Sequence, residues 1–310
     1  MKHNIKITTL LLLMFLVTQL IGLTILSIYS PKIIQTTDEE GRELNITTYN
    51  LPFGMDPPQN TDPGVNLISI IIAITIAVTI ILILMKFRAE LFLRIWFFVV
   101  IIIALGISLN AFILSLPYSS LIALAIAIPL AVIKVFKRDI LIHNLTELLI
   151  YPGIAAIFVP LFNIWTVVLL LILISVYDMY AVWKAGFMQK MARYQIEKVR
   201  VFNGFFIPSI NKKTRELMNK IKLTKDKSSL KQRGIKIPIA ILGGGDIVFP
   251  LILAGVVLAH LGILSALIIS AGATLALGGL LLFSDPKKVY PAMPFITSGC
   301  LIALGIVYLL

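Results

Sequence analysis

Charge is scarce in this chain of 310 residues, since only 14% of it is Asp, Glu, Lys or Arg while 59% is hydrophobic. A water-soluble domain of this length needs far more polar residues to cover its surface. The single cysteine, Cys300, excludes an intrachain disulfide. The three histidines lie in separate segments without an H-E-x-x-H motif, so we expect no metal site. The composition predicts a helical membrane protein.

Nine apolar segments are long enough to cross about 30 Å of hydrocarbon, which takes about 20 helical residues. No β-pattern competes with them, and a helix satisfies its own backbone groups in lipid. The predicted fold class is therefore all-α, a polytopic membrane protein with nine transmembrane helices. The predicted spans are Ile7–Tyr29, Val65–Met85, Leu91–Leu114, Tyr118–Val135, Leu145–Phe162, Ile164–Trp183, Ile237–His260, Gly262–Phe283 and Pro291–Leu310.

The distribution of basic residues predicts the orientation, because Lys and Arg favour the cytoplasmic side of a membrane. They precede the first predicted span and follow each even-numbered one, whereas the loop after the first span is acidic. This pattern places the N-terminus in the cytoplasm and the C-terminus outside. The loop 184–236 holds 15 Lys and Arg against three acidic residues, which accounts for the whole formal net charge of +12. We expect this loop to be cytoplasmic and to contact the lipid bilayer, and no nucleic-acid-binding module is recognisable in it.

Two carboxylates, Asp178 and Asp246, lie inside predicted spans six and seven, where charge is costly and is normally retained for function. Asp178 comes six residues before Lys184 and Asp246 ten after Lys236, so neighbouring antiparallel helices would hold them at a similar depth. Two close carboxyl groups can share a proton, so that one activates water as a general base and the other acts as a general acid. Alternatively, they bond across helices or serve an ion-coupled transporter or cation leak channel.

The remaining acidic residues near the predicted spans flank their ends. We expect them to reach water or lipid headgroups, which is the inexpensive position for a charge near a membrane. Only Asp178 and Asp246 are then left in the hydrocarbon. The flanking residues are Glu90, Asp139, Glu147 and Asp285.

Three short motifs lie in the last four predicted spans, in the order Tyr177-Asp178, Gly243-x-Gly245-Asp246 and Pro291-Ala292-Met293. In order and placement they resemble the YD, GxGD and PAL signature of the presenilin and signal-peptide-peptidase family, which are nine-span intramembrane aspartyl proteases. The resemblance implies an enzyme that hydrolyses peptide bonds within transmembrane segments of other membrane proteins, with Asp178 and Asp246 catalytic and no cofactor. The short loops resemble a prokaryotic or archaeal presenilin homologue that needs no accessory subunits. The oligomeric state and the natural substrate stay open.

The other motif residues have supporting roles under this resemblance. Gly243 and Gly245 would let a substrate backbone approach Asp246, although ordinary close helix packing is the alternative. Pro291 has no N–H, so Pro291, Ala292 and Met293 are predicted to form a docking edge for an extended substrate. Tyr177 either donates a hydrogen bond near the site or packs at a helix interface. This chain departs from the family pattern in having Met293 in place of leucine and Gly244 at the x position, where leucine is frequent.

The predicted helices divide by function. Residues 1–163, with helices one to five, are expected to form a scaffold. Residues 164–310, with helices six to nine and the basic loop 184–236, are expected to form the catalytic part, because all three motifs lie there.

Overall fold

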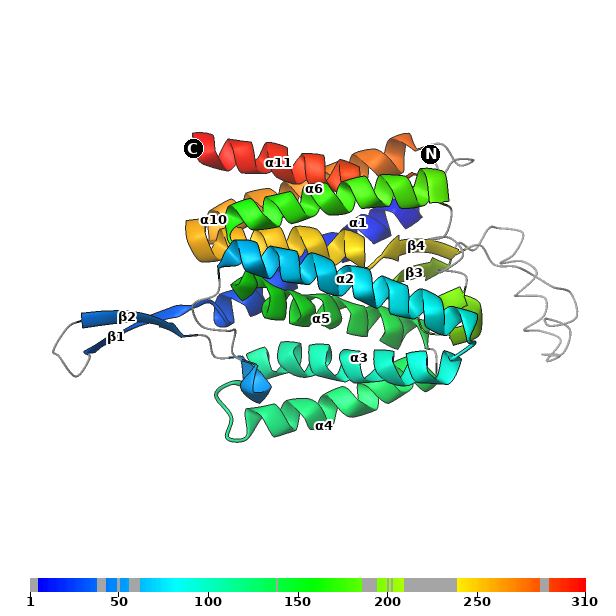
Figure 1. The fold of residues 1–310 in the computed structure, drawn as a ribbon, viewed down its shortest axis with the longest axis horizontal. Helices are drawn as coiled ribbons and strands as arrows, with labels where there is room; N and C mark the ends of the chain where they lie inside the picture. Colours follow the sequence, from blue (N-terminus) through cyan, green and yellow to red (C-terminus); the bar gives the residue numbers. More distant parts are fainter. Residues whose placement is uncertain are drawn as a thin grey trace, which may run out of the picture.

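The chain forms a bundle of long, roughly parallel helices with a short β-ribbon at each end (Figure 1). This computed structural model describes residues 5–37, 43–48, 51–55, 62–137, 139–185, 194–199, 201, 203–208, 239–284 and 290–310. The α-helices among them are α1 (Ile5–Ile28), α2 (Pro63–Lys86), α3 (Glu90–Ile113), α4 (Ser119–Val132), α5 (Ile140–Phe158), α6 (Ile164–Tyr180), α10 (Gly245–Phe283) and α11 (Met293–Leu309).

Seven of the described helices are long and apolar enough to cross a membrane, and α11 is apolar but shorter. The longest, α10, has 39 residues, but Gly262 interrupts it with a φ of 85° and a ψ of 178°. Only glycine adopts such a conformation readily, so α10 consists of two helical arms joined at Gly262. Predicted spans seven and eight meet at this residue. The prediction of an all-α polytopic membrane protein is confirmed, whereas the helix assignment alone does not give nine spans.

Polar residues mark the starts of three helices. Asp62 accepts a hydrogen bond from the Gly64 N–H at 2.7 Å at the start of α2. Asp139 accepts from the N–H groups of Leu141 and Ile142 at the start of α5. Asn163 closes a capping box at the start of α6. Because the first N–H groups of a helix have no partner within it, these side chains fix where each helix begins.

Helix α10 packs against α1, α5, α6 and α11, and its first arm is the more deeply buried part of the bundle. Its side chains are buried on all sides, as Ile247, Leu251 and Leu253 show with no exposed surface. A helix that is apolar all round is typical of a membrane interior. In contrast, α2 lies at the periphery, and only Leu67 and Ile70 are buried in it.

Two antiparallel ribbons were not predicted from the sequence. In the first, β1 (Lys32–Thr37) pairs with β2 (Glu43–Thr48), and in the second, β3 (Gly204–Pro208) pairs with β4 (Ile239–Gly243). The prediction of a helical span over Ile237–His260 is therefore wrong in its first third, because β4 occupies Ile239–Gly243 and the helix begins only at Gly245. Three consecutive glycines disfavour a helix, and pairing with β3 satisfies the strand backbone instead.

The basic loop 184–236 lies mostly outside the described residues. Within it the structure describes a π-helical turn η5 (Gln195–Val199) and strand β3. The side chains of Phe205 and Ile207 in β3 are buried in the core. This part of the loop is thus integrated into the bundle and is not a solvated connection.

Small residues allow α10 and α11 to cross closely. A Cβ on Gly272 would lie 2.7 Å from the backbone oxygen of Gly299, and one on Gly299 would lie 2.6 Å from that of Gly272. A Cβ on Gly299 would also contact the methyl of Ala276. Close approach of small residues replaces the hydrophobic effect as the source of helix association in lipid.

Replacing Gly299 with Val should lower the melting temperature in detergent by several degrees, because overpacking costs about 1–3 kcal/mol. The matched control is Gly305→Val in the same helix, where a Cβ would meet nothing within 4 Å. Thermal unfolding followed by circular dichroism measures both. Equal melting temperatures for the two variants would contradict this packing.

Candidate active site

Asp178 lies in the last turn of α6 and is buried, with 6% of its surface exposed. Its Oδ2 accepts a hydrogen bond from the backbone N–H of Met293 at 3.2 Å, and it also interacts with the backbone of Ala292. These groups open α11, where N–H donors have no partner within the helix. A carboxylate at this position is stabilised by the positive end of the helix dipole. The start of α11 is thus a partner for the Asp178 charge.

A second contact joins the same two helices one turn away. The hydroxyls of Ser175 on α6 and Thr297 on α11 lie 2.7 Å apart, and both residues are buried. Ser175 also donates to the backbone oxygen of Leu171 at 2.7 Å, which leaves its own oxygen to accept from Thr297. This pair fixes the height of α11 relative to Asp178.

Asp246 is the second residue of α10 and follows β4 after two glycines. The Gly244 N–H donates to the backbone oxygen of Asn203 at 3.2 Å, which continues the β3–β4 pairing up to the helix start. Asp246 is half-buried and interacts with the backbone of Gly243. A strand on one side and a helix on the other therefore hold this carboxylate.

The structure brings the two aspartates together. Helices α6 and α10 pack against each other, and the carboxylates of Asp178 and Asp246 are close enough to interact electrostatically. That both lie at a similar depth in the membrane stays a prediction. Two carboxyl groups so placed in a low-dielectric interior form a unit that can hold one proton between them.

The motif glycines have different surroundings. A Cβ on Gly243 would lie 3.2 Å from Oδ2 of Asp246, and a Cβ on Gly244 would lie 2.8 Å from the ring of Tyr151. At Gly245 the nearest atom, from Phe249, would be at an ordinary contact distance of 3.6 Å. The tightest packing is thus at Gly244, a position to which the sequence analysis assigned no contact.

In the Pro291-Ala292-Met293 motif, the side chains of Pro291 and Met293 are buried. The Met293 N–H points to Asp178, so this motif contacts the aspartate directly. Tyr177 is 43% exposed and lines a groove of about 220 Å³ between α2 and α6, together with apolar residues of both helices. Tyr177 directly precedes Asp178 in α6, so the groove reaches the same turn of that helix as the aspartate.

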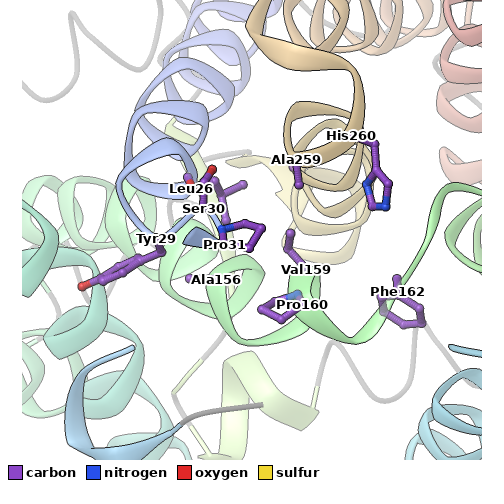
Figure 2. Close-up of a pocket in the computed structure, with 11 residues that line it drawn as sticks. Leu26, Tyr29, Ser30, Pro31, Ala156, Val159, Pro160, Phe162, Ala259 and His260 are labelled. Carbon is purple, nitrogen blue, oxygen red and sulfur yellow. Dashed lines mark hydrogen bonds between the residues drawn. The ribbon is translucent and has the colours of Figure 1, made fainter. Parts of the chain in front are cut away.

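A separate pocket of about 340 Å³ lies where α1, α5 and the first arm of α10 end (Figure 2). It is lined by Tyr29, Pro160 and His260, among others. His260 comes fourteen residues after Asp246, which corresponds to about 21 Å along a helix. This pocket is therefore remote from the aspartates. No group of three or more potential metal ligands occurs in the described part of the chain.

Sequence reasoning missed a buried charged cluster next to the site. Glu147 was expected to reach water but has no exposed surface, and Lys134 is only 4% exposed. Their side chains form an ion pair of 2.5 Å, and His143 lies beside them. The prediction failed because α5 begins at Ile140 and not at Leu145, which puts Glu147 two turns inside the helix. The spacing of His143, Glu147 and Tyr151 at intervals of four was the available signal.

Comparison with known proteins decides the family. The model of a family described as signal-peptide peptidase, presenilin aspartyl protease matches residues 48–310, which is most of the chain. The chain belongs to this family. It is therefore an intramembrane aspartyl protease and an integral multi-pass membrane protein, and the alternative of a transporter or leak channel is set aside.

The fold of this presenilin-family chain is also similar to solved structures. Two of them are structures of a presenilin family intramembrane aspartate protease, in space groups C222 and P2. Both share 16% sequence identity with this chain at a TM-score of 0.57. The first alignment covers 97% of this chain and 98% of the other, and the second covers 96% of each. No curated protein sequence matches the chain.

For this presenilin-family protease we predict that Thr297→Val lowers both the melting temperature and the cleavage rate, because it removes the hydroxyl that pairs with Ser175. Interhelical hydrogen bonds in membranes contribute about 0.6–2 kcal/mol, so the expected stability loss is small, and the rate should fall several-fold as the start of α11 shifts. The control is Ser298→Ala, since the exposed Ser298 hydroxyl donates to the Phe295 oxygen of its own helix and, among the described residues, bonds no other helix. If Thr297→Val keeps the parental melting temperature and cleavage rate, the Ser175–Thr297 contact does not position α11 relative to Asp178.

Proposed function

We propose that Asp178 and Asp246 are the catalytic pair of this protease. The observation that carries the proposal is the placement of two carboxylates on packed helices, each inside an apolar segment and near enough for their charges to interact. One carboxylate takes a proton from water while the water oxygen attacks the substrate carbonyl carbon. The other, protonated, donates a hydrogen bond to the carbonyl oxygen as negative charge develops there. Collapse of the tetrahedral intermediate then breaks the C–N bond as the amine nitrogen receives a proton.

Replacing either Asp178 or Asp246 with Asn should abolish cleavage of a transmembrane substrate by the purified protein, because an amide can neither accept the water proton nor donate as a carboxylic acid does. Asn is close to isosteric, so both variants should keep the parental circular dichroism spectrum and elution volume. Asp139→Asn is the control, since Asp139 is exposed and Asn also caps helices well.

Cleavage that survives in either single variant would contradict the pair. Cleavage by the purified parent protein would in addition support the proposal that accessory subunits are not required.

We further propose that transmembrane segments of other membrane proteins reach the pair along the groove between α2 and α6. The lining is apolar apart from Thr75, Thr79 and Tyr177, which suits a lipid-facing substrate. Tyr177, which lines the groove, is the residue before Asp178 on α6. Because α2 is little buried, the groove is bordered on one side by a helix that has few core contacts.

Filling the groove should therefore slow cleavage. Val78→Trp places an indole among the lining residues, and we expect kcat/KM to fall at least about tenfold, which corresponds to about 1.4 kcal/mol. Ile76→Trp is the matched control, because Ile76 is 53% exposed on the same helix and does not line the groove. Steady-state cleavage of a fluorogenic transmembrane peptide measures both, and equal values would argue against this route.

At the site we propose that the substrate is held in extended form. Pro291, Ala292 and Met293 remain the proposed docking residues, with Gly243 and Gly245 allowing a close backbone approach to Asp246. Strand β4 adds support, since the described ribbon has only two strands and β4 ends at Gly243, three residues before Asp246. An extended segment can pair with such an edge by β-augmentation, which exposes its carbonyl groups to attack.

We propose nine membrane crossings, with the two arms of α10 counted separately and α11 as the last. The opposite placement of the start of α1 and the end of α11 in the bundle supports an odd number (Figure 1). The basic residues support a cytoplasmic N-terminus, a cytoplasmic loop 184–236 and an external C-terminus. By the same proposal, residues 1–163 serve as the scaffold and residues 164–310 carry the chemistry.

A further inference from the structure

One face of α5 carries polar side chains through the apolar bundle. We call Lys134, His143, Glu147 and Tyr151 the α5 ladder; the last three lie on α5, and Lys134 comes from the π-helical turn η2 (Ile133–Lys137) that ends α4. All four are buried, with at most 8% of their surface exposed. Buried charge in a membrane protein is costly and marks function by default, yet the catalytic proposal above does not use this ladder.

The base of the ladder holds strand β3. Lys134 Nζ donates to Oε1 of Glu147 and lies 3.3 Å from Nδ1 of His143. An ammonium group cannot accept, so Nδ1 accepts and the ring proton is on Nε2, which donates to the Gly204 oxygen at 2.8 Å. Next to it, the Asn144 amide bonds both the N–H and the oxygen of Phe206. Because β3 pairs with β4, these contacts of His143 and Asn144 also support β4, the strand that leads to Asp246.

The top of the ladder reaches the active site itself. The ring of Tyr151 packs edge-on against Phe205 of β3, with centroids 5.9 Å apart. A Cβ on Gly244 would lie 2.8 Å from Cε1 and 3.0 Å from the hydroxyl of Tyr151. The phenol thus fills the space that a side chain at position 244 would take. Its hydroxyl interacts electrostatically with both Glu147 and Asp246.

Neither the Tyr151 hydroxyl nor Oε2 of Glu147 makes a hydrogen bond of ordinary geometry among the described residues, although both are fully buried. A buried polar atom without a good hydrogen bond costs free energy, and phenylalanine would supply the same ring without that cost. Packing alone therefore does not account for tyrosine at this position. The Tyr151 side chain contacts Gly244, two residues before the proposed catalytic Asp246, and interacts electrostatically with Asp246 and with the buried Glu147.

We propose that Tyr151 is a positioning residue for Asp246. Its ring packs against the backbone at Gly244, and its hydroxyl interacts electrostatically with Asp246 and with Glu147, the partner of Lys134. In this chain the tyrosine on α5 then occupies the space that a larger residue than glycine would need at the x position of the GxGD motif. The proposal rests on the catalytic role of Asp246.

The test is Tyr151→Phe, assayed with a fluorogenic transmembrane peptide. We expect kcat to fall at least tenfold with KM and the melting temperature within experimental error of the parent, because the ring stays and only the hydroxyl is lost. Tyr29→Phe is the matched control, since Tyr29 is also buried and its hydroxyl donates to the Ile107 oxygen near the remote pocket. There kcat should not change while the melting temperature falls. Parental kcat in Tyr151→Phe would overturn the proposal.

A second variant keeps the hydroxyl and displaces it. Gly244→Ala puts a methyl against the Tyr151 ring, so kcat should again fall with KM unchanged, and a parental kcat there would also overturn the proposal. This variant decides the matter if Tyr151→Phe does not fold. Asp246→Asn in the same assay separates the two proposals: if it is inactive while both Tyr151→Phe and Gly244→Ala are fully active, only the positioning role fails. If Asp246→Asn is active, the catalytic pair fails and this inference with it.

Discussion

The structure depends on one constraint, which is that a charged or polar group inside hydrocarbon must find its partner within the protein. Asp178 meets the constraint through the N–H groups that open α11, and Glu147 meets it through Lys134 at the end of α4. In each case the partner comes from a different helix. The positions of α11 and of the α4 terminus are therefore tied to these charges, and the apolar packing of the bundle must conform to them.

The features that the sequence predicts are local ones. Apolar length predicts the spans, and the short motifs predict which aspartates meet, because both signals are contained in neighbouring residues. The β3–β4 ribbon was not predicted because its strands are far apart in the chain. Each strand is stabilised by pairing with the other, and neither segment alone indicates that partner. Glu147 escaped for a related reason: its partner Lys134 belongs to another helix, and a charge looks peripheral when the span boundary is drawn five residues too late.

Asp246 is held between two rigid elements, since it follows a paired strand and begins a helix that the rest of the bundle surrounds. Sites supported by regular elements keep their geometry more closely than sites on loops. The strand gains its own support from the His143 and Asn144 contacts. The position of the Asp246 carboxylate thus depends on residues of α5, although the motifs of the family lie in later helices.

The peripheral helix α2 has a consequence for the surroundings of the enzyme. Its apolar stretch, Val65–Met85, spans about 32 Å, which matches the roughly 30 Å hydrocarbon core of a typical bilayer, so in a thinner membrane the helix can adapt by tilting. The tilt of a helix responds to bilayer thickness, at a cost of fractions of a kcal/mol per Å of mismatch. Since α2 has little buried surface to resist such a change, thicker and thinner membranes should set different widths for the groove it borders. Lipid composition would then regulate proteolysis without any ligand binding to the protein.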